Sequence, residues 1–380
     1  MSNLMLPCLV ALVTSAFLTV GVRRIALRLN VMDYPDGLRK LHARPMPLWG
    51  GVSLFSAILA GVAVAGTNAF VPSDHAWGTT GVMLVAGAAL CLFGVVDDCR
   101  GLTSRQKLLL QVAALLLLIG LGYRIERIDL FGHSMALGWL GYPVTVVWLL
   151  ACINAFNLLD GGDGLAAAVG LTASLLIAIV ALAMGHREVG VLAVVLAGAA
   201  AGFLVHNHPP ARIFLGDSGS MVIGFVVGIL SVEAATTPQG GAVVVFPAVL
   251  MCLPVFDGLL ALLRRGLSGR PFDEPDRQHI HHRLVERGLN PWQVLGVIVG
   301  LFIVTGTAAA AAILSGYRAI GWTAAATLVI WMARTRWFGH HEWELAVEAF
   351  RPWFARPWIR HGSRTGLAKE KEEPPRRRAA

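Results

Sequence analysis

Charge is scarce in this sequence. Lys, Arg, Asp and Glu together make up 14% of the 380 residues, and 56% are hydrophobic, whereas a soluble globular protein typically carries about 25% charged residues. So few charges cannot cover the surface of a water-soluble protein of this size. Uncharged runs of about 18 or more residues recur instead, each long enough to cross about 30 Å of hydrocarbon. The composition therefore excludes a soluble enzyme, a disordered chain and a disulfide-rich secreted domain, and it predicts a polytopic membrane protein.

Several functional signatures are also missing. The sequence has no Walker motif and no dinucleotide-binding glycine fingerprint, which disfavours ATP hydrolysis and redox chemistry. The five cysteines lie in or beside apolar runs without the spacing of a metal site, so we expect them to be small core residues. No internal repeat indicates a transporter built from two halves.

The apolar segments predict an all-α protein with about eleven transmembrane helices. Continuous apolar runs are typical of membrane helices, whereas barrel strands alternate in polarity over about ten residues. The first run is followed, not preceded, by Arg23-Arg24, so we interpret it as a retained span and not as a signal peptide. The predicted spans are residues 5–22, 50–66, 79–96, 107–122, 143–159, 165–184, 189–205, 218–235, 243–263, 293–314 and 319–333.

The basic residues predict the orientation of these spans. With the N-terminus outside, the cytoplasmic loops are residues 23–49, 97–106, 160–164, 206–217 and 264–292. Together with the C-terminal tail, and counting Lys107 and Arg334 at helix mouths, this side holds 27 of the 31 Lys and Arg residues, as the positive-inside rule requires. We expect a transmembrane catalytic domain over residues 1–334 and a cytoplasmic tail over 335–380, partly interfacial and then disordered.

The acidic residues gather on the same side. The cytoplasmic loops and tail, together with Asp257 at the inner end of a predicted span, contain 18 of the 23 Asp and Glu residues. A carboxylate beside hydrocarbon is unfavourable, so a cluster of carboxylates at helix ends indicates a functional site. Ordinary solvated loop ends are the alternative.

The first polar motif is Asp97-Asp98, at the inner end of a predicted span. Adjacent carboxylates repel each other and readily share a proton unless a cation lies near. Such a pair can bind Mg²⁺ or provide a base. A helix-end pair balanced by Arg100 and Arg105 is the alternative.

The second motif is NAFNLLDGGDGL, which has a polar residue at every third position: Asn154, Asn157, Asp160 and Asp163. This series drifts around a regular helix, so the four side chains can converge only if the helix unwinds at Gly161-Gly162. Amide and carboxylate oxygens at an unwound turn suit a hard cation or a metal-bound phosphate. A turn with incidental polar residues is the alternative.

Two further motifs follow. In HNHPPARIFLGDSGS, Pro209-Pro210 end one helix and Asp217 opens the next, where Mg²⁺ and phosphate can meet; a simple helix N-cap is the alternative. The segment DRQHIHHRL contains three histidines without a cysteine, and they are too close in sequence to face one metal from a regular helix. Nearby arginines favour an anion site there, with a solvated basic loop as the alternative.

Residues 33–51 form a basic loop that contains Lys40 and His42 and ends at Gly50-Gly51. Such a loop attracts anionic lipid or substrate. Together the five motifs combine acidic groups that can hold Mg²⁺ with basic groups that can hold phosphates, which indicates phosphoryl or glycosyl-phosphate transfer. The membrane setting indicates that one substrate is a lipid.

The motifs RKLHARPMPLWGG, VVDDCRGLT, NAFNLLDGGDGL, FLGDSGS and DRQHIHHRL, in this order, resemble the polyprenyl-phosphate N-acetylhexosamine-1-phosphate transferase superfamily. The His-Ile-His-His form is similar to its GlcNAc-1-phosphate branch, whereas the muramoyl-pentapeptide branch tends to have three consecutive histidines. Cys99, where the GlcNAc branch often has Arg, and Gly162 depart from the usual pattern of that branch, but neither removes a charged group that we assign to the chemistry.

The resemblance implies a reaction. UDP-GlcNAc and undecaprenyl phosphate would give undecaprenyl-diphospho-GlcNAc and UMP, with Mg²⁺ or, in its place, Mn²⁺. The expected location is the bacterial cytoplasmic (inner) membrane, with the active site on the cytoplasmic face, where the product starts an envelope polysaccharide such as O-antigen. Membrane lipid is an expected partner and nucleic acid is not. The oligomeric state, a homodimer included, stays open.

The resemblance also implies residue roles. The expected catalytic residues are Asp97, Asp98, Asp160 and His279. The expected metal ligands are Asp217, Asn157 and Asp160. The expected substrate-binding residues are Asn154, Asp163, Asn207, Arg265, His281, His282, Lys40 and His42.

Other functions remain as alternatives. A secondary transporter would place its polar residues near the bilayer midplane, whereas here they gather at one face. A non-catalytic scaffold would not need all five motifs. Within the enzyme class, another UDP-N-acetylhexosamine can replace UDP-GlcNAc, and we expect direct displacement rather than a covalent aspartyl intermediate.

Overall fold

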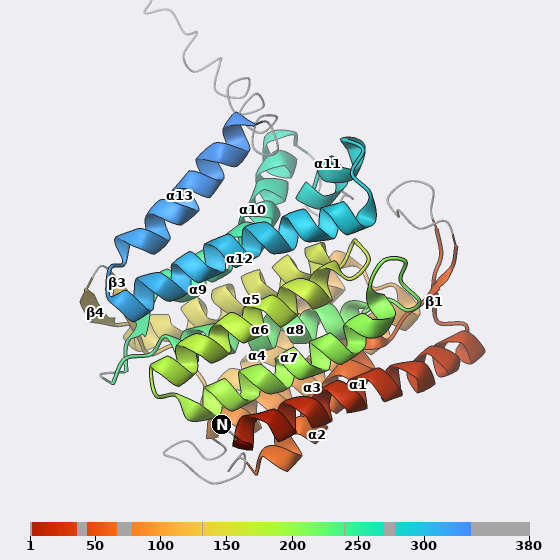
Figure 1. Cartoon of the computed structure of the whole chain (residues 1–380), viewed down its shortest axis with the longest axis horizontal. Coiled ribbons are helices and arrows are strands. Elements are labelled where there is room, and N and C mark those ends of the chain that lie inside the picture. The colour runs from red at the N-terminus through yellow and green to blue at the C-terminus, as the bar shows by residue number, and fades with distance from the viewer. Residues whose placement is uncertain are drawn as a thin grey trace, which may run out of the picture.

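A computed structural model describes residues 2–35, 44–66, 78–130, 132–238, 240–269 and 278–335. Long helices packed side by side make up most of this structure (Figure 1). The helices are α1 (Ser2–Leu29), α2 (Gly50–Ala65), α3 (Gly78–Arg100), α4 (Ser104–Gly120), α5 (Gly141–Leu159), α6 (Leu165–Ala183), α7 (Arg187–Asn207), α8 (Asp217–Ala234), α9 (Val245–Leu250), α10 (Cys252–Leu267), α11 (Ile280–Glu286), α12 (Pro291–Ser315) and α13 (Ala319–Arg334).

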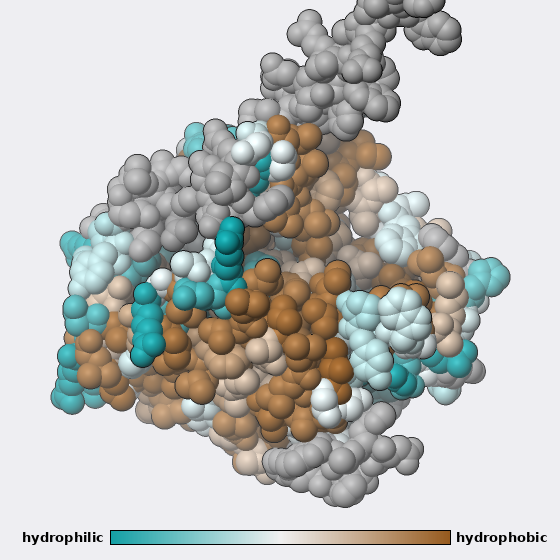
Figure 2. Space-filling model, turned by 180° about the vertical axis from the view of Figure 1, so that it is seen from behind, coloured by the Kyte–Doolittle hydropathy of each residue, from teal (hydrophilic) through white to brown (hydrophobic). Residues whose placement is uncertain are grey.

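The protein is a multi-pass membrane protein. Within the described residues, seven helices are long and apolar enough to cross a bilayer, namely α1, α3, α5, α6, α7, α8 and α12. The helices α2 and α13 are apolar but have only 16 residues each. A broad hydrophobic surface lies between more hydrophilic margins (Figure 2), as a lipid-facing belt requires. The count of eleven spans and the orientation of the termini stay predictions, and the predicted tail lies outside the described residues beyond Thr335.

The prediction of residues 243–263 as one helical span is wrong. The structure has two helices there, since α9 ends at Leu250 and α10 begins at Cys252. Pro247 and Pro254 lie on either side of this break, and proline cannot donate the backbone hydrogen bond that a continuous helix needs. The helix α10 then rises beyond α12 in the view of Figure 1.

Short strands, which the all-α prediction did not include, mark the two ends of the bundle (Figure 1). At one end, β1 (Met32–Asp33) pairs antiparallel with β2 (Met46–Pro47). At the other, β3 (Arg127–Leu130) pairs antiparallel with β4 (His133–Ala136) and parallel with β5 (Ala242–Val243). The polar motifs lie at the end that contains β1, which is called the β1 end below.

The helix α8 forms the centre of the bundle. Of its 18 residues, 16 are buried, and its neighbours include α2, α3, α5 and α6. Small residues allow this close approach: a Cβ atom added to Gly224 would lie 2.5 Å from the carbonyl oxygen of Cys152 on α5, in the manner of membrane helices that pack through glycine. The position of α8 therefore determines the position of Asp217, its first residue.

Candidate active site

Two glycines hold the start of α8 in place. A Cβ atom on Gly51 of α2 would lie 2.1 Å from the amide nitrogen of Gly219, and one on Gly94 of α3 would lie 2.3 Å from the backbone of Ser218. The amide of Gly51 also donates to the carbonyl oxygen of Leu215, at 2.9 Å. These backbone contacts give the Gly50-Gly51 pair a role that the sequence did not indicate, since it fixes the loop before α8.

Asp217 lies at the centre of a polar network at the β1 end. Its carboxylate oxygen Oδ2 is 2.9 Å from Lys107 Nζ, and the same ammonium group is 2.7 Å from Asp97 Oδ2. The other oxygen, Oδ1, accepts a hydrogen bond from the side-chain amide of Asn157, which also donates to Ser220 Oγ at 3.1 Å. Four helices, α3, α4, α5 and α8, thus contribute to one charged centre, which includes Asp97, Lys107, Asn157 and Asp217.

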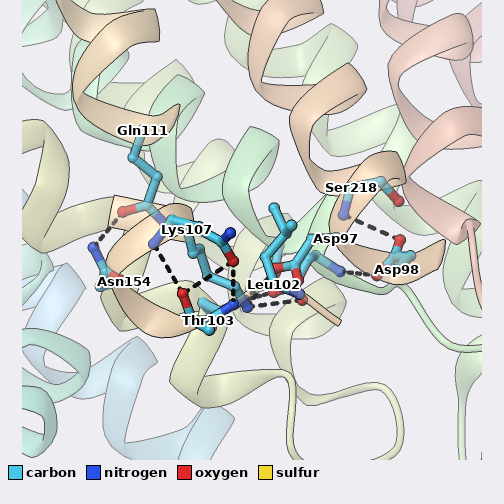
Figure 3. A network of polar contacts seen from close by, with 12 residues as sticks. Asp97, Asp98, Leu102, Thr103, Lys107, Gln111, Asn154 and Ser218 are labelled. Carbon is cyan, nitrogen blue, oxygen red and sulfur yellow. Dashed lines mark hydrogen bonds and ion pairs between the residues drawn. The ribbon is translucent and has the colours of Figure 1, made fainter. Parts of the chain in front are cut away.

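The two adjacent aspartates of α3 have different partners (Figure 3). Asp97 contacts Lys107 and accepts a hydrogen bond from the amide of Leu102 at 2.8 Å. Asp98 accepts hydrogen bonds from the amides of Asp217, at 2.8 Å, and Ser218, at 3.4 Å. Asp98 therefore caps α8 from a different helix and satisfies amides that the helix itself cannot pair.

Asp217 is not the cap of its own helix, so the N-cap alternative is wrong. The N-cap position is Gly216, which has a φ of 72° and no side chain. A Cβ atom there would lie 2.6 Å from Asp98 Oδ2. Glycine at this position thus leaves room for Asp98 to cap the helix, and the carboxylate of Asp217 turns toward Lys107 and Asn157.

Asp160 follows α5 and lies close to the same centre. Its carboxyl group accepts a hydrogen bond from the amide of Gly216. Removal from water raises the pKa of Asp160 well above its usual value, and the carboxylates of Asp217 and Asp98 raise that pKa further. An additional positive charge at this position would favour ionised Asp160.

The four polar residues of the second motif do not converge. Only Asn157 and Asp160 lie at the charged centre. Asn154 donates to Gln111 Oε1 at 2.9 Å, which joins α5 to α4. Asp163 accepts a hydrogen bond from the amide of Ala211, also at 2.9 Å. The helix ends before Gly161, as the glycines allow. The first and last polar residues of the motif, Asn154 and Asp163, contact neighbouring segments instead of the charged centre.

Asp163 and Asn207 organise the loop between α7 and α8. The bond from Ala211 to Asp163 joins this loop to the turn after α5. Asn207 is buried, and its side-chain amide donates to the carbonyl oxygen of Ile213 at 2.9 Å. The side chains of both residues contact backbone atoms of this loop. Substrate binding by either residue stays a prediction.

The three histidines lie beside the charged centre and are all buried. His279 precedes α11, and its Nδ1 atom is 3.1 Å from Asp257 Oδ2 on α10. His281 faces the turn after α5, since a Cβ atom on Gly161 would lie 2.7 Å from its Nε2 atom. The rings of His281 and His282 are 4.1 Å apart. The histidine segment therefore adjoins the turn that contains Asp160.

His281 differs from its neighbours in having no hydrogen-bond partner for either ring nitrogen within the described part of the chain. Burial lowers the pKa of His281 well below its usual value, and the imidazoles of His282 and His279 lower it further. His281 is therefore neutral. Arg265 lies in the last turn of α10, whereas Lys40 and His42 lie outside the described residues.

The charged centre has donors that suit a divalent cation, although the described residues contain no group of three or more His, Cys, Asp or Glu side chains arranged to hold one. Carboxylate and amide oxygens are the ligands that Mg²⁺ prefers, and Asp217 and Asn157 provide both. The ammonium of Lys107 already occupies the space between two carboxylates. The donor set therefore fits Mg²⁺ once the carboxylates exchange this ammonium for the metal.

Three residues of the site were absent from the sequence-based assignment: Lys107, Ser220 and Asp257. Lys107 did give a signal, because a lysine at the start of an apolar run needs an anionic partner. Asp257 gave a similar one, as a carboxylate within a predicted span. Neither signal identifies the partner, which depends on how the helices pack.

Known proteins resemble this chain in the region of the site. The model of the family described as glycosyl transferase family 4 matches residues 80–235, the stretch from α3 to α8. A Bacillus subtilis protein named probable undecaprenyl-phosphate N-acetylglucosaminyl 1-phosphate transferase is 32% identical over 292 residues, which cover 76% of this chain and 79% of the relative. The chain belongs to glycosyl transferase family 4.

Further relatives agree with this membership. A decaprenyl-phosphate N-acetylglucosaminephosphotransferase of Mycobacterium tuberculosis is 34% identical over 326 residues, covering 78% of this chain and 79% of the relative. An undecaprenyl-phosphate alpha-N-acetylglucosaminyl 1-phosphate transferase of Escherichia coli is 28% identical over 297 residues, covering 76% and 77%. The family 4 protein is therefore a phosphoglycosyltransferase, and the resemblance to the GlcNAc-1-phosphate branch of its superfamily is confirmed.

Proposed function

We propose that this family 4 enzyme transfers GlcNAc-1-phosphate from UDP-GlcNAc to undecaprenyl phosphate, releasing UMP and starting an envelope polysaccharide. The observation that carries the proposal is the charged centre, in which carboxylates from α3 and α8 surround the ammonium of Lys107 beside the amide of Asn157. The names of the relatives support the donor sugar and the polyprenyl acceptor. The excess of basic residues at the β1 end supports a cytoplasmic active site in the inner membrane.

In the proposed reaction, an oxygen of the lipid phosphate attacks the β-phosphorus of UDP-GlcNAc. The bond between this phosphorus and the bridging oxygen breaks, and UMP leaves with that oxygen. A phosphate monoester has a second pKa near 6, so the lipid phosphate needs little help to lose its proton. The enzyme mainly has to bring two anions together and orient them in line.

The residues of the site divide this task. Asp217 and Asn157, with Asp160, would hold Mg²⁺, which when bound offsets the charge of the diphosphate and of the departing UMP. Asp97 keeps Lys107 at the centre, where its ammonium group can contact a phosphate. His279, His282 and Arg265 would donate to the diphosphate or the sugar.

Membranes that contain the protein provide the test. Incubated with radiolabelled UDP-GlcNAc, undecaprenyl phosphate and Mg²⁺, they should produce a labelled lipid and an equal amount of UMP. The Asp217→Asn variant, which has a similar shape but no charge, should lose this activity. No UMP release in the presence of Mg²⁺ would contradict the proposal, and a panel of UDP-N-acetylhexosamines identifies the sugar.

A further inference from the structure

A buried carboxylate that the proposed reaction leaves without a task lies beside the histidine segment. Asp257 lies in the second turn of α10, on the buried face that also contains Leu260 and Arg264, and only 2% of it is exposed. Its Oδ2 atom is 3.1 Å from Nδ1 of His279. Its Oδ1 atom is buried and has no hydrogen-bond partner within the described residues.

A carboxylate in this position controls the proton on the histidine. Because an ionised carboxylate only accepts hydrogen bonds, the proton of His279 is held on Nδ1, and Nε2 is the nitrogen that remains for another partner. Asp257 therefore fixes the orientation of the His279 ring and leaves Nε2 to face a group of the substrate.

The charged and titratable groups around His279 separate its role from that of His281. On α10 the buried face presents Asp257 and Arg264, and on α11 His279 faces His281, whose ring is parallel to its own at a centroid distance of 6.0 Å. Neither ring nitrogen of His281 has a hydrogen-bond partner within the described residues. Of these two histidines, His279 is therefore the one whose ring a carboxylate orients.

We propose that Asp257 is a positioning residue for the transfer reaction, which holds the ring of His279 through Nδ1 and thereby directs Nε2 toward the nucleotide sugar. The proposal rests on the proposed function, since it assumes that the substrate is a nucleotide diphosphate. It assigns the three histidines different tasks, with His279 as the one that a carboxylate positions.

A double-mutant cycle on UMP release tests whether Asp257 acts through His279. The four proteins are the wild type, Asp257→Asn, His279→Gln and the double variant. We expect Asp257→Asn to lower kcat/KM on the order of 10- to 100-fold, as removal of a carboxylate that orients a functional histidine does elsewhere. In the double variant, the loss should equal that of His279→Gln alone, because without the imidazole the carboxylate has nothing to orient.

A matched control completes the test. A purely structural defect of Asp257→Asn would lower the rate by the same factor with and without His279, whereas a positioning role predicts a loss only when His279 is present. Glu286→Gln, which neutralises an exposed carboxylate at the end of α11, should leave kcat/KM unchanged. If the wild type is active and the losses of the two single variants multiply in the double variant, the positioning role is wrong and the proposed function still stands. A wild type that is inactive with every UDP-sugar overturns the proposed function and, with it, this inference.

Discussion

The contact between α3 and the start of α8 gives a sharp prediction for the Gly94→Ala variant. The new methyl group would lie 2.3 Å from the backbone of Ser218, whereas ordinary contacts begin at 3.4 Å. Backbone atoms cannot rotate away as a side chain can. The two helices must therefore separate by about 1 Å, or the helix α8 must shift along its axis by a similar distance.

The consequence for activity follows from the neighbouring contacts. Asp98 lies one turn after Gly94 and accepts the amide of Asp217 at 2.8 Å, so a separation of about 1 Å breaks this hydrogen bond. A misplacement of about 1 Å at a reacting centre can lower a rate by about 100-fold. We expect this loss in UMP release, together with a decrease in stability of about 1–3 kcal/mol from overpacking.

The matched control is Gly300→Ala on α12, where an added Cβ atom has no other atom within 4 Å. Alanine favours a helix over glycine by about 0.5–1 kcal/mol, so this variant should keep full activity and an equal or higher melting temperature in detergent. Both variants add one methyl group to a helical glycine. Equal activity of the two variants would refute the claim that the α3–α8 contact determines the geometry of the charged centre.

Three further predictions concern single side chains. Lys107→Met leaves two carboxylates without their cation, so the free energy of unfolding should fall by about 3–5 kcal/mol when metal is removed with EDTA. Added Mg²⁺ should restore much of the melting temperature. Equal melting temperatures in EDTA and in Mg²⁺ would argue against metal binding there. Asp163→Ala removes the hydrogen bond from the amide of Ala211, so trypsin should cleave faster after the exposed Arg212. Asp163→Asn keeps an acceptor and should be affected less. Equal cleavage rates in the wild type and both variants would show that this hydrogen bond does not hold the loop. Because the pKa of His281 is lowered in the folded protein, the unfolded chain takes up a proton below about pH 6.5 that the folded protein does not. The free energy of unfolding should therefore fall by up to about 1.4 kcal/mol per pH unit below that pH. In His281→Gln the melting temperature should depend less on pH, and an unchanged dependence would contradict a neutral His281.

The helices of the bundle could be predicted closely, and their interruptions could not. Residues 165–184 were predicted as one span and form the helix Leu165–Ala183, because hydrophobic length is a strong signal over a whole membrane crossing. The break at Met251 changes no average polarity, so hydropathy does not reveal it, and the signal of Pro247 and Pro254 on either side is lost in such an average. Strands of two to four residues, such as Met32–Asp33, are too short to show an alternating pattern.

The site shows the same limit at the level of single residues. The sequence indicated that Asp97 and Asp98 are functional, and it suggested a repelling pair that shares a proton. Adjacent helical residues point about 100° apart, however, and each aspartate has its own partner, Lys107 for one and the amides of α8 for the other. The partner of Asp98 lies 119 positions away in sequence, so it depends on helix packing that no local pattern encodes. Asp97 finds Lys107 across the turn between α3 and α4.

The start of α8 explains why the motifs have the form they do. A helix that begins with a free carboxylate usually uses that carboxylate to cap itself, and Asp217 would then be unavailable to a cation. Here Gly216 supplies no cap and leaves space for Asp98, which arrives from α3 and accepts the free amides instead. The second aspartate of the pair thus satisfies the helix, and the first holds Lys107 in place. Asp217 keeps its charge directed at Lys107 and Asn157, on the side where a metal and a diphosphate would meet.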